Sequence, residues 1–149
     1  MSNNPFDHPE ELFHLSVKAL IRDSEGKVLV LEANPKHTSV KHWDLPGGRL
    51  HKGMDLETTL RRELEEEIGL KAVKIIELLD CSISNHRVNF EPNSVGIVLF
   101  TFICEIPENE KIELTDEEHI SFDWVSSQKA SELLSHKFST SLTEKLKNL

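Results

Sequence analysis

Residues 55–69 restrict the fold more than any other part of this chain, because they carry the spacing of an amphipathic helix and a signal for each of its ends. Apolar residues recur every four positions, at Leu56, Leu60, Leu64 and Ile68, which places them on one face of a helix. Asp55 belongs to the residue types that cap a helix start, and Gly69 to those that follow a helix end. The pattern predicts a helix from Asp55 to Ile68 with one edge on the core.

Three carboxylates crowd the adjoining face of this predicted helix. At about 100° per residue, Glu63, Glu66 and Glu67 fall close together on the wheel, whereas Glu65 points away to solvent. Like charges three or four residues apart destabilise a helix by about 0.2–0.5 kcal/mol per pair. A solvated acidic face is the ordinary interpretation. The alternative is a site for a hard cation such as Mg²⁺, which takes carboxylate, water and phosphate oxygens.

Length and charge exclude several classes of protein. A chain of 149 residues fits one domain covering residues 1–149. A net charge of −9 disfavours binding to nucleic acid. No apolar run approaches the roughly 18 residues that span a bilayer, and the first residues lack the features of a secretory signal. We therefore expect a cytoplasmic protein, in which the two cysteines are reduced and buried.

The remaining patterns predict a mixed α/β chain. Strand-like segments and two further helical segments follow one another, and Asn34 to His42 reads as a loop. The predicted strands are Phe13 to Ile21, Lys27 to Leu31, Ala72 to Ile83 and Val95 to Glu105, and the predicted helices are near Ser127 to Leu134 and Ser139 to Lys147. Such an order predicts an α/β or α+β sandwich around a mixed sheet.

The segment from Gly48 to Leu70, GRLHKGMDLETTLRRELEEEIGL, resembles the Nudix box. That pattern is Gly, five residues, Glu, seven residues, Arg-Glu, an aliphatic residue, any residue, Glu-Glu, any residue, Gly and an aliphatic residue. The positions that match in register are Gly48, Arg62, Glu63, Leu64, Glu66, Glu67, Gly69 and Leu70. Such a match arises by chance in on the order of one chain in a hundred thousand. The resemblance implies a Nudix-type α/β/α sandwich around a mixed β-sheet.

One position departs from the family pattern, because Met54 stands where the box has its first Glu. Methionine can neither bind a hard cation nor pair with Arg62. In the family this Glu usually orients the helix, so the departure bears on helix positioning more than on the metal. Asp55 and Glu57 are candidates to replace it in part. A catalytically weak module that binds or senses a nucleotide is the alternative that Met54 favours.

The resemblance continues on both sides of the box. Trp43 to Gly48, WDLPGG, is similar to the lead-in common in the family, where the carbonyl of the first Gly joins the metal shell; this implies Gly47. Further on, the acidic run Asp116-Glu117-Glu118 precedes a segment with Trp124. It looks like the family's late acidic loop, which leads into a strand and supplies another ligand or the base. Glu118 is the better match.

The implied function is Mg²⁺-dependent hydrolysis of a phosphoanhydride in a nucleoside diphosphate linked to another moiety, with Mn²⁺ as a substitute ion. The implied metal ligands are Gly47, Glu63, Glu66 and Glu67, and the implied catalytic residues are Glu63, Glu66 and Glu118. Candidate phosphate contacts are Arg49, Lys52 and Arg87, for each of which a solvated surface role is the alternative. Arg62 braces the helix.

The substrate follows only by elimination. The Pro typical of ADP-ribose members, the Tyr of dinucleoside-polyphosphate members and the flanking motif of coenzyme A members are all missing. A nucleoside triphosphate or a related small diphosphate remains. Isomerase chemistry on isopentenyl diphosphate would require a reactive cysteine, which two buried thiols do not offer. Dimers are common in the family, so a homodimer is a further expectation by resemblance.

Overall fold

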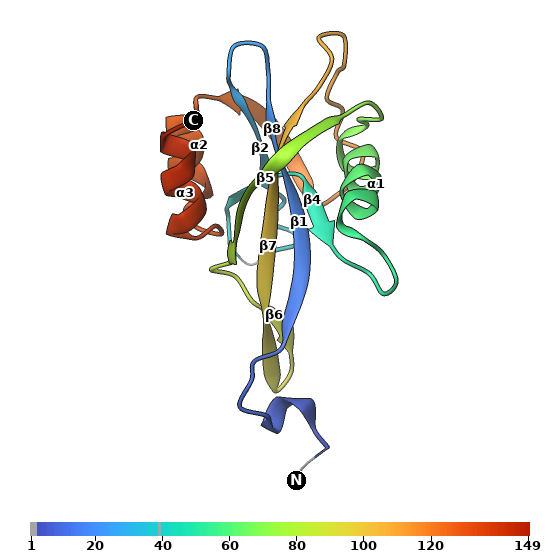
Figure 1. Cartoon of the computed structure of the whole chain (residues 1–149), viewed down its shortest axis with the longest axis vertical. Helices are drawn as coiled ribbons and strands as arrows, with labels where there is room; N and C mark the ends of the chain where they lie inside the picture. Colours follow the sequence, from blue (N-terminus) through green and yellow to red (C-terminus); the bar gives the residue numbers. More distant parts are fainter. Residues whose placement is uncertain (1–2, 39) are drawn as a thin grey trace.

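A mixed β-sheet separates one helix from two others in the computed structural model of the chain, which describes residues 3–38 and 40–149 (Figure 1). The strands are β1 (Phe13–Arg22), β2 (Val28–Ala33), β3 (Trp43–Asp44), β4 (Gly47–Arg49), β5 (Lys74–Ile83), β6 (Val88–Phe90), β7 (Asn93–Glu105) and β8 (His119–Val125). The helices are η1 (Pro5–Asp7), α1 (Leu56–Ile68), α2 (Ser127–Leu134) and α3 (Thr140–Lys147).

The sheet is built on β1 and β7, which run parallel from the pair Phe13–Gly96 to the pair Arg22–Glu105. Its strand order is β3-β2-β1-β7-β5, with β8 beside β2 and β6 beside β7. The other edge of β1 is shared by two strands: β2 pairs with it only near Arg22, whereas β4 pairs with it around Val17. The short β4 therefore enters the sheet where β1 and β2 diverge.

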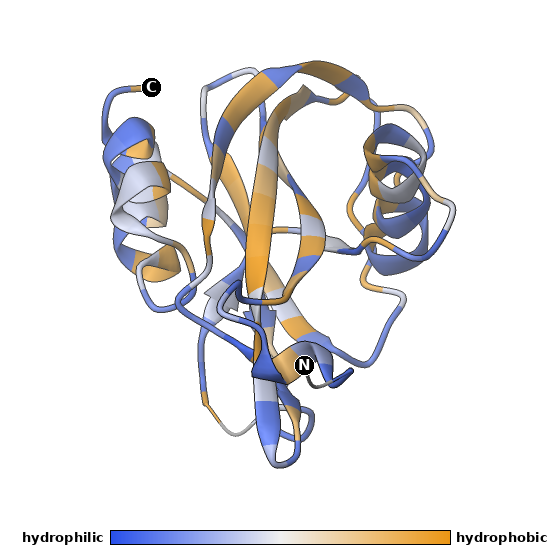
Figure 2. Ribbon diagram, turned by 60° about the horizontal axis from the view of Figure 1, so that its bottom comes forward, coloured by the Kyte–Doolittle hydropathy of each residue, from blue (hydrophilic) through white to orange (hydrophobic). Residues whose placement is uncertain are grey.

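Both faces of the sheet are buried, because successive side chains of a strand point to opposite faces. Val17, Ala19 and Ile21 of β1 belong to the apolar cluster that α1 completes, whereas Leu20 belongs to the cluster completed by α2 and α3. Figure 2 shows the resulting hydrophobic bands along the strands and on the helix faces turned toward them. The expected α/β/α sandwich around a mixed sheet is confirmed.

Local signals define the ends of α1 as the sequence predicts. The Asp55 side chain accepts a hydrogen bond from the Thr58 backbone N–H at 2.7 Å, which satisfies one of the free donors of the first turn. Gly69 adopts a left-handed conformation with φ of 70°, and its N–H donates to the Glu65 carbonyl at 3.1 Å. The glycine costs little here because it lacks the Cβ that disfavours positive φ.

A buried carboxylate ties α3 to the edge strand β5. Asp80 accepts hydrogen bonds from Ser82 and Ser141 at 2.5 Å each and from the Lys145 ammonium at 2.9 Å. Burial alone would raise the pKa of Asp80, but the two hydroxyl donors and the ammonium lower it below its ordinary value. The charged carboxylate is therefore part of how the terminal helix is held.

The expected burial of both cysteines is half right. Cys104 is buried, and burial raises the pKa of its thiol to about 12. Cys81 is exposed, which corrects the expectation. It lies on β5, the last strand in the sheet order, where two register shifts against β7 interrupt the regular alternation of buried and exposed positions. No helix in the described ranges is both long and apolar enough to cross a membrane.

Candidate active site

Two adjacent glycines let β4 approach β1 and α1 closely. A Cβ on Gly47 would lie 1.9 Å from the Val17 carbonyl oxygen, and its φ of 147° is strained for other residues. A Cβ on Gly48 would lie 2.5 Å from the carboxyl carbon of Glu63. The glycines thus bring the backbone of β4 directly against the carboxylate side of α1.

The segment from Glu113 to Glu118 brings a second set of acids to the same place. Its backbone docks on the end of α1, where Glu113 N–H donates to Ile68 O at 3.1 Å and Thr115 N–H to Glu67 O at 3.0 Å. At its other end, the Asn34 N–H donates to Glu118 O at 2.7 Å. These bonds fix the acidic segment between α1 and the end of β2.

Four ligand atoms come together as a result. Glu67, Asp116, Glu118 and His119 each offer one atom, and these atoms all lie within 4.8 Å of one another. His119 Nδ1 lies 3.4 Å from Asp116 Oδ1 and 3.5 Å from Glu67 Oε2. In the described part of the chain, Asp116 Oδ1 and His119 Nδ1 are buried without a hydrogen-bond partner. Unsatisfied buried atoms in a compact set of carboxylates and an imidazole fit a divalent cation.

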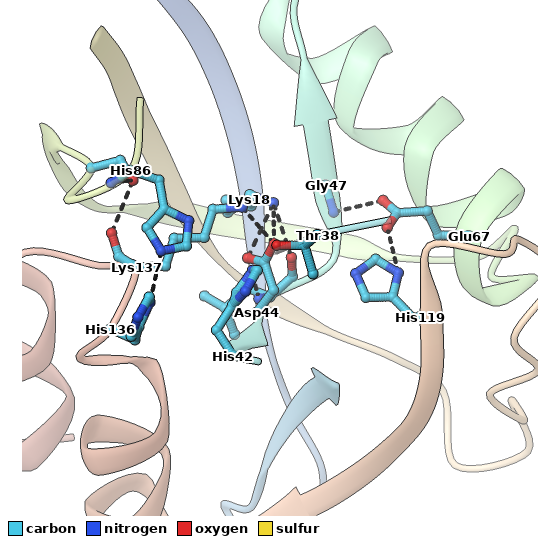
Figure 3. Close-up of polar contacts among 12 residues, drawn as sticks. Lys18, Thr38, His42, Asp44, Gly47, Glu67, His86, His119, His136 and Lys137 are labelled. Atoms are coloured by element: carbon cyan, nitrogen blue, oxygen red, sulfur yellow. Dashed lines mark hydrogen bonds and ion pairs between the residues drawn. The ribbon is translucent and has the colours of Figure 1, made fainter. Parts of the chain in front are cut away.

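Glu67 is the most perturbed of these acids. Its side chain is 5% exposed, and its Oε1 accepts a hydrogen bond from the Gly47 N–H at 2.9 Å. Burial raises the pKa of Glu67 to about 8, because the favourable effect of Lys18 and of the Gly47 N–H does not offset desolvation. A cation beside this carboxyl group would favour its ionised form. Figure 3 shows Glu67 between Gly47 and His119.

The other carboxylates predicted from the box lie differently. Glu63 is half-buried beside Gly48, and burial, with the charges of Glu66 and Glu118, raises its pKa despite the opposing charge of Arg62. Glu66 is exposed, and its backbone carbonyl accepts a hydrogen bond from the Thr115 hydroxyl. Neither residue belongs to the compact four-atom group, so their role as metal ligands stays a prediction.

Arg62 lies beside the acidic cluster, with its guanidinium 3.2 Å from Glu63 Oε1 and 3.4 Å from His51 Nδ1. Its Nε is buried and has no hydrogen-bond partner among the described residues. This unsatisfied donor is what the family pattern leads one to expect where Met54 replaces an acidic partner of the arginine.

A buried group of charges lies next to the acids. Lys18 donates to both Asp44, at 3.2 Å, and the Leu45 carbonyl, at 3.2 Å. The Lys137 ammonium lies 2.6 Å from the same Asp44 carboxylate. Although burial alone would raise it, the charges of Lys137 and Lys18 hold the pKa of Asp44 well below its ordinary value. Figure 3 shows the ends of both lysine side chains next to Asp44.

A cavity of about 530 Å³ joins the acids to these lysines. Arg49 and Arg87 line it, but Lys52 lies outside it in a separate exposed groove. The role of these residues as phosphate contacts stays a prediction. The Arg87 guanidinium is already held by the carboxylate of Glu11 and by Ser94. The cavity is large enough for a nucleotide-sized ligand.

Three histidines stand at the lysine end of this cavity. His86 Nε2 and His136 Nδ1 are 2.8 Å apart, and His42 meets the His86 ring edge-on with centroids 4.7 Å apart. Burial, followed by the charge of Lys137, lowers the pKa of His86 to about 4, so this ring is neutral near pH 7.

Sequence patterns alone did not identify the charged residues Lys18, Asp44 and Lys137 that line the cavity. Lys18 was the available signal, because it interrupts the apolar strand around Val17 and Ala19 with a charge that must find a partner when buried. Its partner Asp44 is 26 residues away, and Lys137 is a further 93 residues along the chain. No local spacing connects three residues so far apart.

Comparison with known proteins identifies the family. Residues 12–146 match the NUDIX domain. The chain belongs to the Nudix family. A "MutT-like protein" of Streptomyces ambofaciens is 26% identical over 91% of this chain and 78% of that protein. An "ADP-ribose pyrophosphatase" of Bacillus subtilis is 28% identical over 80% of this chain and 62% of that protein.

A MutT protein from Methanosarcina mazei shares the fold, with a TM-score of 0.66 and 25% identity over 95% of both chains. The resemblance carried by the box is thus confirmed, and with it the expectation that this Nudix chain is a pyrophosphohydrolase. In this Nudix fold, Glu67 of α1 thus lies together with Asp116 and Glu118 of the acidic segment before β8.

Proposed function

We propose that this Nudix protein hydrolyses a phosphoanhydride bond in a Mg²⁺-dependent reaction, with a nucleoside triphosphate or a related small nucleoside diphosphate derivative as substrate. The observation that carries the proposal is the four-atom group of Glu67, Asp116, Glu118 and His119 at the edge of a cavity that also holds Lys18 and Lys137. A diphosphate needs cations on both sides of it, and this cavity offers a cation site facing fixed ammonium groups.

Glu67, Asp116, Glu118 and His119 would hold the divalent ion, with the Gly47 carbonyl as a neighbouring oxygen donor. When bound, Mg²⁺ neutralises phosphate charge and lowers the pKa of bound water. Three carboxylates suit Mg²⁺, and the imidazole of His119 also suits Mn²⁺. Glu67 is oriented by the N–H of Gly47, which holds the carboxylate against β4.

Glu63 is the general base in this proposal. It lines the cavity, is half-buried and lies outside the four-atom group. Its Oε1 accepts a hydrogen bond from Arg62 at 3.2 Å, and its other carboxylate oxygen would take a proton from water. Burial raises the pKa of Glu63, which makes it a stronger base than an exposed carboxylate. Glu118 belongs to the ligand group, and the exposed Glu66 does not line the cavity.

Arg49 and Lys18 are the chain's own contacts for the phosphates nearest the acids. Arg49 follows Gly48 on β4 and lines the cavity, with its guanidinium 3.4 Å from His14 Nδ1. Lys18 lines the same cavity, and the charges of Asp44 and Glu67 both raise its pKa, so its ammonium lies near the acids. Such fixed donors stabilise charge that develops on phosphate oxygens.

The proposal is tested by hydrolysis of a nucleotide panel with and without Mg²⁺. The panel contains nucleoside triphosphates, ADP-ribose, NADH and dinucleoside polyphosphates, and the products are separated by chromatography. We expect Mg²⁺-dependent turnover of at least one compound and a loss of about a hundredfold or more in Glu63→Gln. Glu65→Gln, which removes an exposed carboxylate of the same helix, is the matched control and should retain activity. The absence of turnover above the Glu63→Gln level would refute the proposal.

A binding or sensing module is the second candidate, and the unsatisfied Arg62 Nε favours it. A helix braced less firmly than in other family members holds its carboxylates less accurately, and small misplacements are costly in catalysis. The same panel separates the two functions. A sensor binds a nucleotide with Mg²⁺ and returns it unchanged, whereas an enzyme converts it.

A further inference from the structure

Lys137 differs from the other cation of the buried charge group in having no acid of its own. Lys18 interacts with two carboxylates, those of Asp44 and Glu67. Their charges raise the pKa of Lys18, although burial alone would lower it. Among the described residues, Lys137 pairs only with Asp44, which it shares. Burial and the neighbouring charge of Lys18 lower the pKa of Lys137 despite that pairing. Asp44 thus serves two ammonium groups, and among the described residues Lys137 is the one that has no carboxylate of its own.

Backbone hydrogen bonds fix the position of Lys137. Lys137 lies in the turn between α2 and α3, where its carbonyl accepts hydrogen bonds from Asn85 N–H at 2.8 Å and from Ser84 Oγ at 2.9 Å. The Asn85 side chain also donates to the carbonyls of Ser135 and Phe138. The Lys137 side chain is 15% exposed and lines the cavity. The ammonium is therefore held in place rather than free in solvent.

Among the described residues, the other acids that line the cavity, Glu63, Glu67 and Glu118, form no ion pair with Lys137. His86 and His136 pair beside Lys137, and His42 completes the wall. Burial, and after it the charge of Lys137, lowers the pKa of His86 to about 4. A buried ammonium that lacks a carboxylate of its own and lies beside the neutral imidazole of His86 is stabilised by an anion from outside the chain.

We propose that Lys137, with His86 beside it, forms a subsite for a phosphate group additional to the two phosphates of the scissile bond. This subsite rests on the proposed function. It assigns the substrate to nucleoside diphosphate derivatives that carry a third phosphate. That phosphate is either the terminal phosphate of a triphosphate chain or a phosphomonoester on a ribose. Both present the same dianionic oxygens to Lys137.

The test compares binding within two ligand pairs, each differing by one phosphate: ATP with ADP, and NADPH with NADH. Dissociation constants are measured by titration calorimetry in EDTA, with the ligands recovered intact afterwards. We expect wild-type protein to bind the phosphate-richer member of at least one pair about tenfold or more tightly. A preference confined to ATP identifies a chain-terminal phosphate, and one confined to NADPH identifies a ribose phosphate.

Substitutions decide whether Lys137 carries the preference. Lys137→Met and Lys137→Gln should reduce it to about threefold or less, and Lys137→Arg should retain it because the charge is kept. The amide of Lys137→Gln can still donate to Asp44, which guards against loss of folding. Lys129→Met removes an exposed lysine from α2 and should leave the preference unchanged. Equal binding within both pairs, or a preference that survives both neutral variants, overturns the subsite. Neither result depends on turnover, so the subsite and the hydrolytic function fail separately.

Discussion

The buried charge group allows a quantitative prediction about stability, because Asp44 lies 3.2 Å from the Lys18 ammonium and 2.6 Å from the Lys137 ammonium, and no other carboxylate among the described residues pairs with both. Asp44→Asn leaves Lys18 and Lys137 buried beside each other without the carboxylate that they share. Removing one partner of a buried ion pair costs about 3–5 kcal/mol. With a urea m-value of about 2 kcal/mol per molar, the unfolding midpoint should fall by about 2 M.

Urea unfolding followed by tryptophan fluorescence measures this loss. Lys137→Met in the Asp44→Asn background should recover on the order of 1 kcal/mol, because it removes one of the two repelling charges. Glu144→Gln breaks an exposed pair with Lys147 and is the control, with an expected cost below about 1 kcal/mol. The reasoning is refuted if Asp44→Asn costs no more than Glu144→Gln, or if the second substitution adds to the loss.

Three further predictions address the helix, the glycine pair and the edge of the sheet. Gly48→Ala should lower kcat/KM by about tenfold or more, because its Cβ would lie 2.5 Å from the Glu63 carboxyl carbon; steady-state kinetics at the wild-type level would contradict this. Met54→Glu should raise the free energy of unfolding by about 1 kcal/mol by giving Arg62 an acidic partner, and an unchanged or lower urea midpoint would count against it. Asp80→Asn should cost about 1–3 kcal/mol at pH 7. Because the folded pKa of Asp80 lies below its ordinary 3.8, that stabilisation is present above about pH 4 and is lost as the pH falls through the folded pKa. A stability gap between Asp80→Asn and wild type that is as large at pH 2 as at pH 7 would show that the charge is not involved.

The parts of the fold that the sequence predicts are those set by local rules. The start of α1 at Asp55 and its end at Gly69 depend on hydrogen bonds within a few residues, so the spacing and the cap residues suffice. The burial of Cys81 was predicted wrongly because it depends on β5 being an edge strand with two register shifts. Neither property is encoded in the neighbouring residues.

The candidate site likewise contains residues that local sequence patterns predict and residues that they do not predict. Glu67 and Glu63 could be named from the box, and Glu118 from its position before Trp124. The close approach of Gly47 and Gly48 to α1 decides whether a carboxylate of this helix is buried against β4 or exposed. Glu67 is buried there, whereas Glu66 is exposed. The pairing of Lys18, Asp44 and Lys137 needs the complete topology, because it joins β1, β3 and the turn between α2 and α3.

The location of the metal is the most direct test of the proposed active site. Crystals soaked in Mn²⁺ and measured at its absorption edge should give an anomalous peak among Glu67, Asp116, Glu118 and His119, the four residues whose ligand atoms lie within 4.8 Å of one another. The peak should disappear in Glu67→Gln. A peak on the exposed Glu66 side of α1, or no peak in wild-type crystals soaked at millimolar Mn²⁺, would contradict the assignment.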